Sequence, residues 1–208
     1  MQGKIMTAVF LIFATFVFVP ALSQANPTVV GYDGSGNQLI YDPVRNITWY
    51  DYTYKGTDGV SGATWDQAKS WVAGLKVGGV SGWRLPTTEQ LSGLDSAYTN
   101  VGEMGQLRID LGIINGHMAN TEGEPFKNLV TGALYWTGTP NTNSGSIPQA
   151  WLYTMYYGEQ ASGRVDGKEY VLAIYDGKVT APVPIPGAIL LFAPGLAGIA
   201  AIRRRFKK

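Results

Sequence analysis

The sequence contains no cysteine and a single histidine, His117. Without cysteine there can be no disulfide, thiol nucleophile, thiolate metal site or thioether-linked cofactor. A histidine-based triad could use only His117, no Gly-x-Ser-x-Gly motif accompanies it, and its neighbours Asn115, Gly116 and Asn120 are typical of a solvated loop. We therefore expect no catalytic residue and no cofactor.

Positive charge is also scarce where a domain could use it. Between residues 26 and 180 there are 10 basic and 15 acidic residues, a net charge of −5. The remaining basic residues lie at the two ends of the chain. A domain of this charge lacks the basic excess that binds nucleic acid or anionic lipid, so we expect no nucleic-acid partner.

The first 25 residues have the layout of a secretory signal peptide. Lys4 precedes an apolar run over residues 5–19, and small residues lie three and one positions before Asn26. This pattern predicts cleavage by signal peptidase, with Asn26 as the mature N-terminus. The alternative is an uncleaved N-terminal anchor, although the run is short for a membrane span and is broken by Pro20.

A second apolar run lies near the other end of the chain. Residues 185–202 carry no charge and would form a helix roughly 27 Å long, close to the roughly 30 Å thickness of a bilayer core. We expect a transmembrane helix whose basic end stays on the cytoplasmic side and leaves the preceding domain outside. The alternative is a buried core helix. The basic end that is predicted to stop the chain in the membrane consists of Arg203, Arg204, Arg205, Lys207 and Lys208.

The motif Val183-Pro184-Ile185-Pro186, followed by the apolar span and the arginine-rich end, resembles the PEP-CTERM class of bacterial sorting signals in its VPxP variant. The resemblance implies that exosortase, a membrane-embedded cysteine protease, removes the tail and releases or transfers the protein. Such proteins are typical of Gram-negative bacteria that make exopolysaccharide. The expected location is the inner membrane during sorting and then the envelope, the cell surface or the exterior. Ile185 stands where the eponymous form has glutamate.

Residues 26–180 are enough for one domain, and their patterns predict an α+β fold with its termini close together. Thr64 and Gln67 fit a capping box that opens a helix with Trp65, Ala68, Trp71, Val72 and Leu75 on one face. A second helix is predicted after Pro86, capped by Thr87 and Gln90, with Leu91 and Leu94 facing inward. Residues 95–130 indicate irregular structure with a helical turn at 106–111. Strands are predicted at 28–32, 38–41, 46–50, 133–137, 149–157 and 169–175.

Five segments, 42–49, 64–68, 82–87, 135–139 and 170–176, are together similar to a bacterial family of unknown function. Its members are described as C-type-lectin-like, and one such domain ends a collagen-like surface adhesin. The resemblance covers roughly residues 31–178 and implies antiparallel strands, two flanking helices and pairing of the first and last strands. We interpret the shared residues as scaffold: Trp49, Trp65, Trp83, Arg84, Leu85, Pro86 and Trp136.

The calcium site of animal C-type lectins does not carry over to this chain. Those lectins use a Glu-Pro-Asn or Gln-Pro-Asp step and a Trp-Asn-Asp step, whereas this chain has Glu124-Pro125-Phe126 and Trp151-Leu152-Tyr153. Neither set supplies the six to eight oxygen ligands that calcium takes. Residues 33–37 alternate oxygen-bearing side chains but fit a plain turn better. We therefore predict no metal.

The most aromatic stretch of the domain is 151–157. Alternation would place Trp151, Tyr153 and Met155 on one face of a strand and Leu152 and Tyr156 on the other. Either one face is an exposed platform for a glycan or polymer, with Trp151, Tyr153 and Tyr156 as its candidate residues, or both faces are buried.

These observations favour a non-enzymatic, exported surface or matrix protein that acts in binding or adhesion in exopolysaccharide or biofilm contexts. Two alternatives remain open. An envelope glycan hydrolase would need Glu122 or Glu124 in a cleft beside another acid. An uncut tail would instead anchor the domain in the inner membrane.

Overall fold

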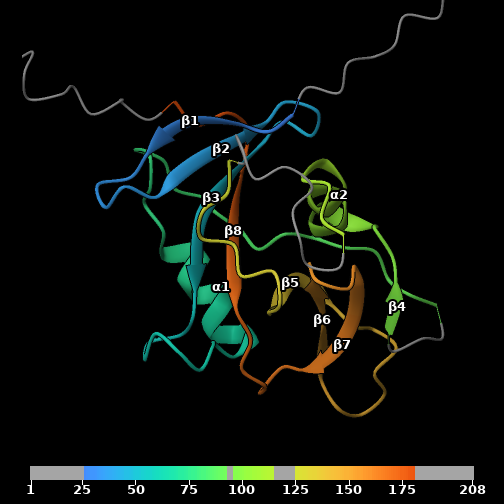
Figure 1. Cartoon of the computed structure of the whole chain (residues 1–208). Helices are drawn as coiled ribbons and strands as arrows, with labels where there is room; N and C mark the ends of the chain where they lie inside the picture. The colour runs from blue at the N-terminus through green and yellow to red at the C-terminus, as the bar shows by residue number, and fades with distance from the viewer. Residues whose placement is uncertain (1–25, 93–95, 115–124, 181–208) are drawn as a thin grey trace, which may run out of the picture.

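Eight strands form two four-stranded antiparallel sheets in the computed structural model, which describes residues 26–92, 96–114 and 125–180 (Figure 1). One sheet has the order β1-β2-β3-β8, and the other has the order β4-β7-β6-β5. The strands of the first sheet are β1 (Thr28–Tyr32), β2 (Gln38–Asp42), β3 (Ile47–Tyr54) and β8 (Val171–Asp176). Those of the second are β4 (Ser96–Tyr98), β5 (Leu134–Pro140), β6 (Gln149–Thr154) and β7 (Glu159–Arg164).

Strands lie at all six predicted places, but their extents and pairing differ from expectation. The predicted strand 149–157 ends at Thr154, and the chain turns back as β7, whose sequence Glu-Gln-Ala-Ser-Gly-Arg gives no apolar signal. The expected pairing of first and last strands is wrong. The last strand, β8, pairs with β3, because the 33–37 turn folds β1 back onto the outer side of β2.

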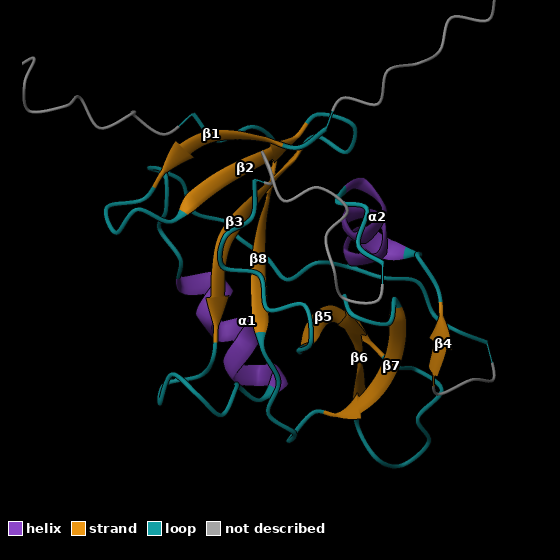
Figure 2. Ribbon diagram, in the orientation of Figure 1, coloured by secondary structure: helices purple, strands orange, loops and turns teal. Residues whose placement is uncertain are grey.

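Both faces of the β1-β2-β3-β8 sheet are buried over its central strands. Successive residues of a strand point to opposite faces, and Trp49 and Tyr50 of β3 enter different core clusters. The same division separates Ala173 from Ile174 in β8. The domain therefore has two apolar cores that share one sheet, and the two helices lie on opposite sides of β8 (Figure 2).

The first helix, α1 (Trp65–Gly74), confirms the predicted capping box. The backbone N–H of Gln67 donates to Thr64 Oγ1 at 3.3 Å, and that of Thr64 donates to Gln67 Oε1 at 2.9 Å. Ala68 and Val72 are buried, and Trp65, Trp71 and Leu75 pack against the same core. The predicted apolar face is therefore the one that covers the sheet.

The predicted second helix after Pro86 is wrong, because residues 86–92 form neither a helix nor a strand. Thr87 and Gln90, which were expected to cap this helix, instead form hydrogen bonds with residues distant in the sequence. The backbone N–H of Thr87 donates to Glu103 Oε2 at 2.6 Å, and Gln90 bonds to Pro140 and Trp151. Leu94 lies outside the described residues.

The second helix is instead α2 (Gly102–Asp110), within the stretch predicted to be mostly irregular. Its first residue follows Val101, which makes no side-chain capping bond, so the capping signal that marked α1 is missing. Met104 and Leu107 are buried in the second core, which explains why the helix forms despite a weak sequence pattern.

Arg84 ties the segment after α1 to the rest of the domain. Its backbone pairs with Ile174 of β8 at 2.8 and 2.9 Å, while its guanidinium bonds to Asp176 and to Glu103 of α2. Among the residues interpreted as scaffold, five are buried: Trp49, Trp83, Leu85, Pro86 and Trp136. Trp65 is half-buried and donates from Nε1 to the carbonyl of Thr137 at 2.8 Å.

Within residues 26–92, 96–114 and 125–180 no helix is long and apolar enough to cross a membrane. The predicted signal peptide, the sorting motif, the predicted span and the basic end all lie outside those ranges. The two ends of the described chain, near Asn26 and Thr180, both lie beside the β1–β2 hairpin (Figure 1). The predicted proximity of the domain's ends thus agrees with the fold.

The glycine loop after β3 gives a stability prediction. Gly56 has φ +82°, and a Cβ added there would lie 2.0 Å from the carbonyl oxygen of Gly62. We expect Gly56→Ala to lower the free energy of unfolding by at least about 1 kcal/mol. Gly34→Ala, whose Cβ would meet no atom within 4 Å, is the matched control. Urea unfolding measures both, and equal midpoints would contradict the argument.

Candidate functional site

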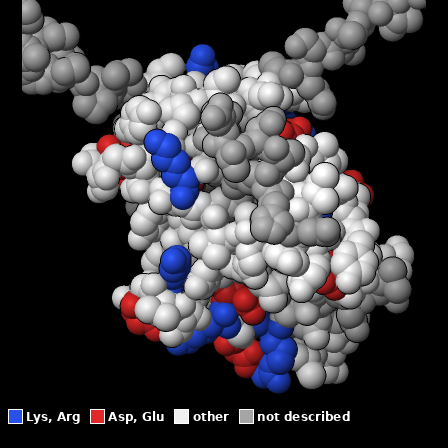
Figure 3. All heavy atoms as spheres, in the orientation of Figure 1, with Lys and Arg blue, Asp and Glu red and all other residues white. Residues whose placement is uncertain are grey.

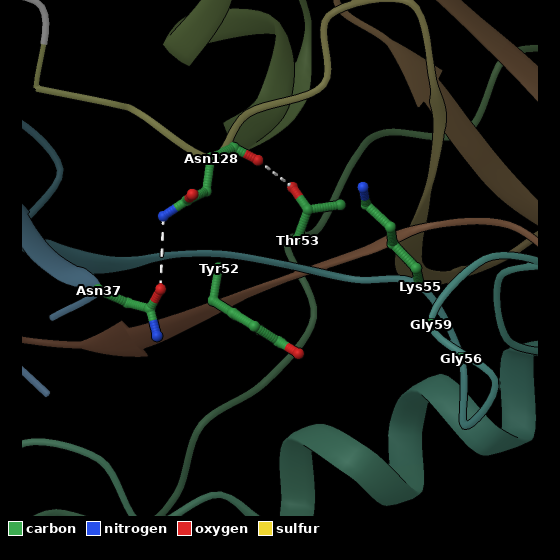
Figure 4. A pocket seen from close by; sticks show the side chains of 7 residues that line it. All are labelled: Asn37, Tyr52, Thr53, Lys55, Gly56, Gly59 and Asn128. Atoms are coloured by element: carbon green, nitrogen blue, oxygen red, sulfur yellow. Dashed lines mark hydrogen bonds between the residues drawn. The ribbon is translucent and has the colours of Figure 1, made fainter. Parts of the chain in front are cut away.

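A hollow of about 260 Å³ opens beside the end of β3 (Figure 4). Tyr52, Thr53 and Lys55 line it from β3 and the residue after the strand, and Gly56 and Gly59 line it from the following loop. The amides of Asn37 and Asn128 complete the lining. Three segments far apart in the sequence therefore meet here: the β1–β2 turn, the end of β3 and the segment before β5.

An aromatic array borders this hollow. Tyr52 is 38% exposed, and its ring lies 5.6 Å from that of Tyr50 and 6.1 Å from that of Trp71, measured between centroids. Trp71 in turn stacks on Tyr54 at 4.6 Å with an interplanar angle of 4°. The alternation of β3 puts the three tyrosines on one face, where α1 supplies the tryptophan. The site thus combines flat apolar surface with polar groups.

Asn37 is held in place by the carboxylate of Asp33. Asn37 Nδ2 donates to Asp33 Oδ2 at 2.8 Å, and the Asn37 backbone N–H donates to Asp33 Oδ1 at 2.8 Å. The Tyr50 hydroxyl donates to the same carboxylate at 2.5 Å. These bonds connect the β1–β2 turn to the aromatic face of β3.

Asn128 is held by a second carboxylate, that of the fully buried Asp51. The backbone N–H groups of Lys127 and Asn128 donate to Asp51 Oδ2 and Oδ1 at 2.8 and 3.0 Å. Asn128 Nδ2 donates to the backbone carbonyl of Asp51 at 2.8 Å, and the Thr53 hydroxyl donates to the carbonyl of Asn128 at 2.6 Å. This segment is therefore positioned by side chains from β3.

The two carboxylates have pKa values shifted in opposite directions. Burial raises the pKa of Asp33, but hydrogen bonds from Tyr50, Asn37 and Ser35 outweigh it and bring that pKa below the ordinary 3.8. Burial raises the pKa of Asp51 above 3.8, and the N–H groups of Lys127 and Asn128 offset this only in part. The difference follows from the deeper burial of Asp51.

Among the described residues that line the hollow, Lys55 is the only charged one. Its ammonium nitrogen lies 5.6 Å from the centroid of the Tyr170 ring. No carboxylate from the described part of the chain lines the hollow, and Asp33 and Asp51, which lie behind it, accept hydrogen bonds from the protein's own donors. The arrangement is suited to holding a polar ligand with an apolar face.

The predicted platform is wrong for two of its three residues. Trp151 and Tyr153 are both 0% exposed, which is the buried alternative for this stretch. Trp151 Nε1 donates to Gln90 Oε1 at 3.0 Å, and the Tyr153 hydroxyl donates to the carbonyl of Thr99 at 3.2 Å. Both rings lie on the same face of β6, and the segments that contain Gln90 and Thr99 cover them there. Only Tyr156, at 37%, is exposed.

No group of three or more histidine, cysteine, aspartate or glutamate side chains that could hold a metal occurs in the described ranges. The Asp33 carboxylate stabilises the turn formed by residues 33–37, because Asp33 Oδ1 accepts hydrogen bonds from the backbone N–H groups of Ser35 and Asn37 at 2.8 Å each. His117, Glu122 and Glu124 lie outside the described residues.

A larger hollow, of about 410 Å³, lies at the start of α2, but its principal charges are paired within the protein. Arg45 bonds to Asp42 and Asp110, and Glu103 bonds to Arg84 and Thr87. These contacts join α2 to the sheet. We therefore assign them a structural role.

The residues that line the hollow beside β3 were not among the predicted site residues. The predicted third strand ended at residue 50, whereas β3 continues to Tyr54. The alternation of Tyr50, Tyr52 and Tyr54 was a usable strand signal. The roles of Asn37 and Asn128 depend on a contact between residues 91 positions apart, which no local pattern indicates.

The Asp33 network predicts a pH-dependent contribution to stability. Because the folded-state pKa is lowered, the contribution is present above the ordinary aspartate pKa and is lost as the pH falls through the folded-state value. We expect Asp33→Asn to cost about 1–2 kcal/mol at neutral pH and progressively less in acid. Asp66→Asn, which removes only an exposed ion pair with Lys69, is the control. Urea unfolding across pH gives the difference, and a cost that is constant with pH would contradict the assignment.

Figure 3 shows one face of the domain, where uncharged surface predominates and basic side chains are interleaved with acidic ones. Such a face has no continuous basic patch of the kind that binds a nucleic-acid backbone. The expectation of no nucleic-acid partner stays a prediction from the net charge.

The family model described as the Lcl C-terminal domain matches residues 38–174. The match runs from the first residue of β2 into β8 and includes Tyr52, Lys55 and Asn128. No curated protein and no solved structure matches the chain. The match supports the lectin-like resemblance seen in the sequence, while the sorting signal stays a prediction. Because it covers well over half of the 208 residues, the chain belongs to the Lcl C-terminal domain family.

Proposed function

We propose that this chain is an exported, non-enzymatic protein that binds a surface or matrix polysaccharide through the hollow beside β3. The observation that carries the proposal is the exposed Tyr52 ring next to a hollow lined by two amides and Lys55. A sugar has apolar C–H faces and a rim of hydroxyl groups. An aromatic ring with a few placed polar groups complements both parts.

The lectin-like family supports a binding role, and the lining of the hollow favours it over hydrolysis. Most glycosidases use two carboxylates on either side of the scissile bond. The described residues that line this hollow include no aspartate or glutamate. The hydrolase alternative depends on Glu122 and Glu124, and no described acid is placed in this hollow to work with them.

The ends of the chain support a route to the cell surface. Signal peptidase would cut before Asn26, and exosortase would recognise the tail that carries Val183-Pro184-Ile185-Pro186. The basic residues from Arg203 onward would keep the last residues in the cytoplasm until the tail is removed. The domain would then act at the surface or in a matrix of exopolysaccharide, as in a biofilm.

Replacing Tyr52 tests the binding site. We expect Tyr52→Ala to weaken retention of the full-length chain on immobilised polysaccharides by roughly tenfold, because it removes the stacking ring. Tyr98→Ala, an exposed tyrosine on β4 of the other sheet, should retain binding. Affinity measurements on a panel of bacterial exopolysaccharides, dextran, mannan and galactan give the comparison. Loss of binding in Tyr156→Ala but not in Tyr52→Ala would move the site to the β6–β7 turn.

Intact-mass analysis of the envelope and secreted fractions tests the route. We expect a species that begins at Asn26 and lacks the basic end, because signal peptidase and exosortase remove the two terminal segments. Changing Pro184 and Pro186 together to alanine should leave the tail attached. If the protein isolated from its host cell retains residues 185–208 and stays in the inner membrane, the anchored alternative is supported instead.

A further inference from the structure

The orientation of the two asparagine amides in the hollow indicates which chemical groups of a sugar the hollow recognises. We propose that the hollow presents carbonyl oxygens from Asn37 and Asn128 and therefore selects sugar residues with free, adjacent hydroxyl groups that can donate hydrogen bonds. The inference rests on the proposed function and specifies its ligand class. It depends on the two carboxylates that lie behind the amides.

Asn37 cannot readily turn its amide nitrogen toward a ligand. Nδ2 donates to Asp33 Oδ2 at 2.8 Å and lies 3.4 Å from the Tyr50 hydroxyl. A flipped amide would place its oxygen against the carboxylate, where two acceptors would face each other. Asn37 Oδ1 is thereby left on the side of Asn128, whose Nδ2 makes a long contact of 3.4 Å with it (Figure 4).

Asn128 has the same constraint from the other side. Its Nδ2 donates to the Asp51 backbone carbonyl at 2.8 Å and lies 3.5 Å from Asp51 Oδ2. Both of these partners are acceptors, so a flip would again oppose two oxygens. No residue within the described ranges donates a hydrogen bond to Asn128 Oδ1, and Asn128 is exposed.

The lining therefore offers two amide oxygens that accept, and an ammonium group, Lys55, that donates. A hydroxyl group can donate to an amide oxygen while its own oxygen accepts from the lysine. An ether oxygen can accept but cannot donate, so an amide oxygen that faces it loses a partner. The site should therefore bind sugars with free hydroxyl groups more tightly than sugars whose hydroxyl groups are converted to ethers.

The test compares dextran, mannan and galactan with their O-methyl and O-hydroxyethyl derivatives, using the full-length chain. Methylation removes the donors, whereas hydroxyethylation adds more bulk but retains one donor for each substituted oxygen, at the end of a flexible two-carbon arm. We expect methylation to weaken binding roughly tenfold or more, and hydroxyethylation to weaken it clearly less. Equal losses with both derivatives would indicate steric exclusion and overturn the inference.

Asp33→Asn gives a second readout that loss of stability alone would not produce. An asparagine at position 33 can offer N–H groups to Asn37, which frees the Asn37 amide to flip and present its nitrogen to an ether. The ratio of affinities for free and methylated polymer should then fall toward one, while Asp66→Asn keeps the ratio of the natural protein. An unchanged ratio in Asp33→Asn would contradict the role given to that carboxylate.

The outcomes separate the inference from the proposed function. If methylated and free polymers bind equally and Tyr52→Ala abolishes both, the hollow binds polysaccharide but does not read hydroxyl donors. If no polymer in the panel binds, the proposed function fails and the inference fails with it. Selective binding of the free polymers that depends on Tyr52 supports both.

Discussion

The pairing of β3 with β8 is the constraint on which the rest of the structure depends. It joins the beginning of the domain to its end and places two strands in the middle of a sheet that is buried on both faces. Each strand must then supply apolar side chains alternately to two cores, and each face needs its own cover. Helix α1 covers one face, and α2 covers the other with Met104 and Leu107. Arg84 strengthens the arrangement because it binds β8 through its backbone and α2 through its side chain.

The hollow beside β3 lies where this strand continues past the end of its pairing with β2. Tyr50 is the last β3 residue in register with β2, opposite Leu39, so the strand runs on to Tyr54 without β2 alongside it. The polar groups there need other partners, and the segment around Asn128 supplies them through Asp51 and Thr53. The polar hollow lies beside a row of tyrosines because β3 is longer than the part of it that pairs with β2.

Two aspartates, the buried Asp51 and the partly buried Asp33, have a positioning role in this domain. The carboxylate of each accepts several N–H donors. Asp33 holds the Asn37 amide through its carboxylate, and Asp51 holds the Asn128 amide mainly through its backbone carbonyl. Such a network makes the site rigid before any ligand arrives, which lowers the entropy lost on binding. The absence of cysteine is consistent with this construction, because packing and hydrogen bonds replace disulfide bridges in holding the loops.

Local patterns were sufficient where one segment carried the whole signal. The sequence by itself determined the capping box of α1 and its apolar face, the 33–37 turn, the positions of six strands and the burial of Trp49, Trp83 and Trp136, because propensity and alternation act over a few residues. Only the tertiary structure decided that residues 86–92 are not helical, that α2 begins at Gly102, that β8 pairs with β3 and that Trp151 and Tyr153 are covered. These outcomes depend on contacts such as Thr87 with Glu103 and Gln90 with Trp151, between residues distant in the chain. Asn37 and Asn128 could not be predicted as site residues for the same reason, since an amide becomes part of a site only when folding brings its partners to it.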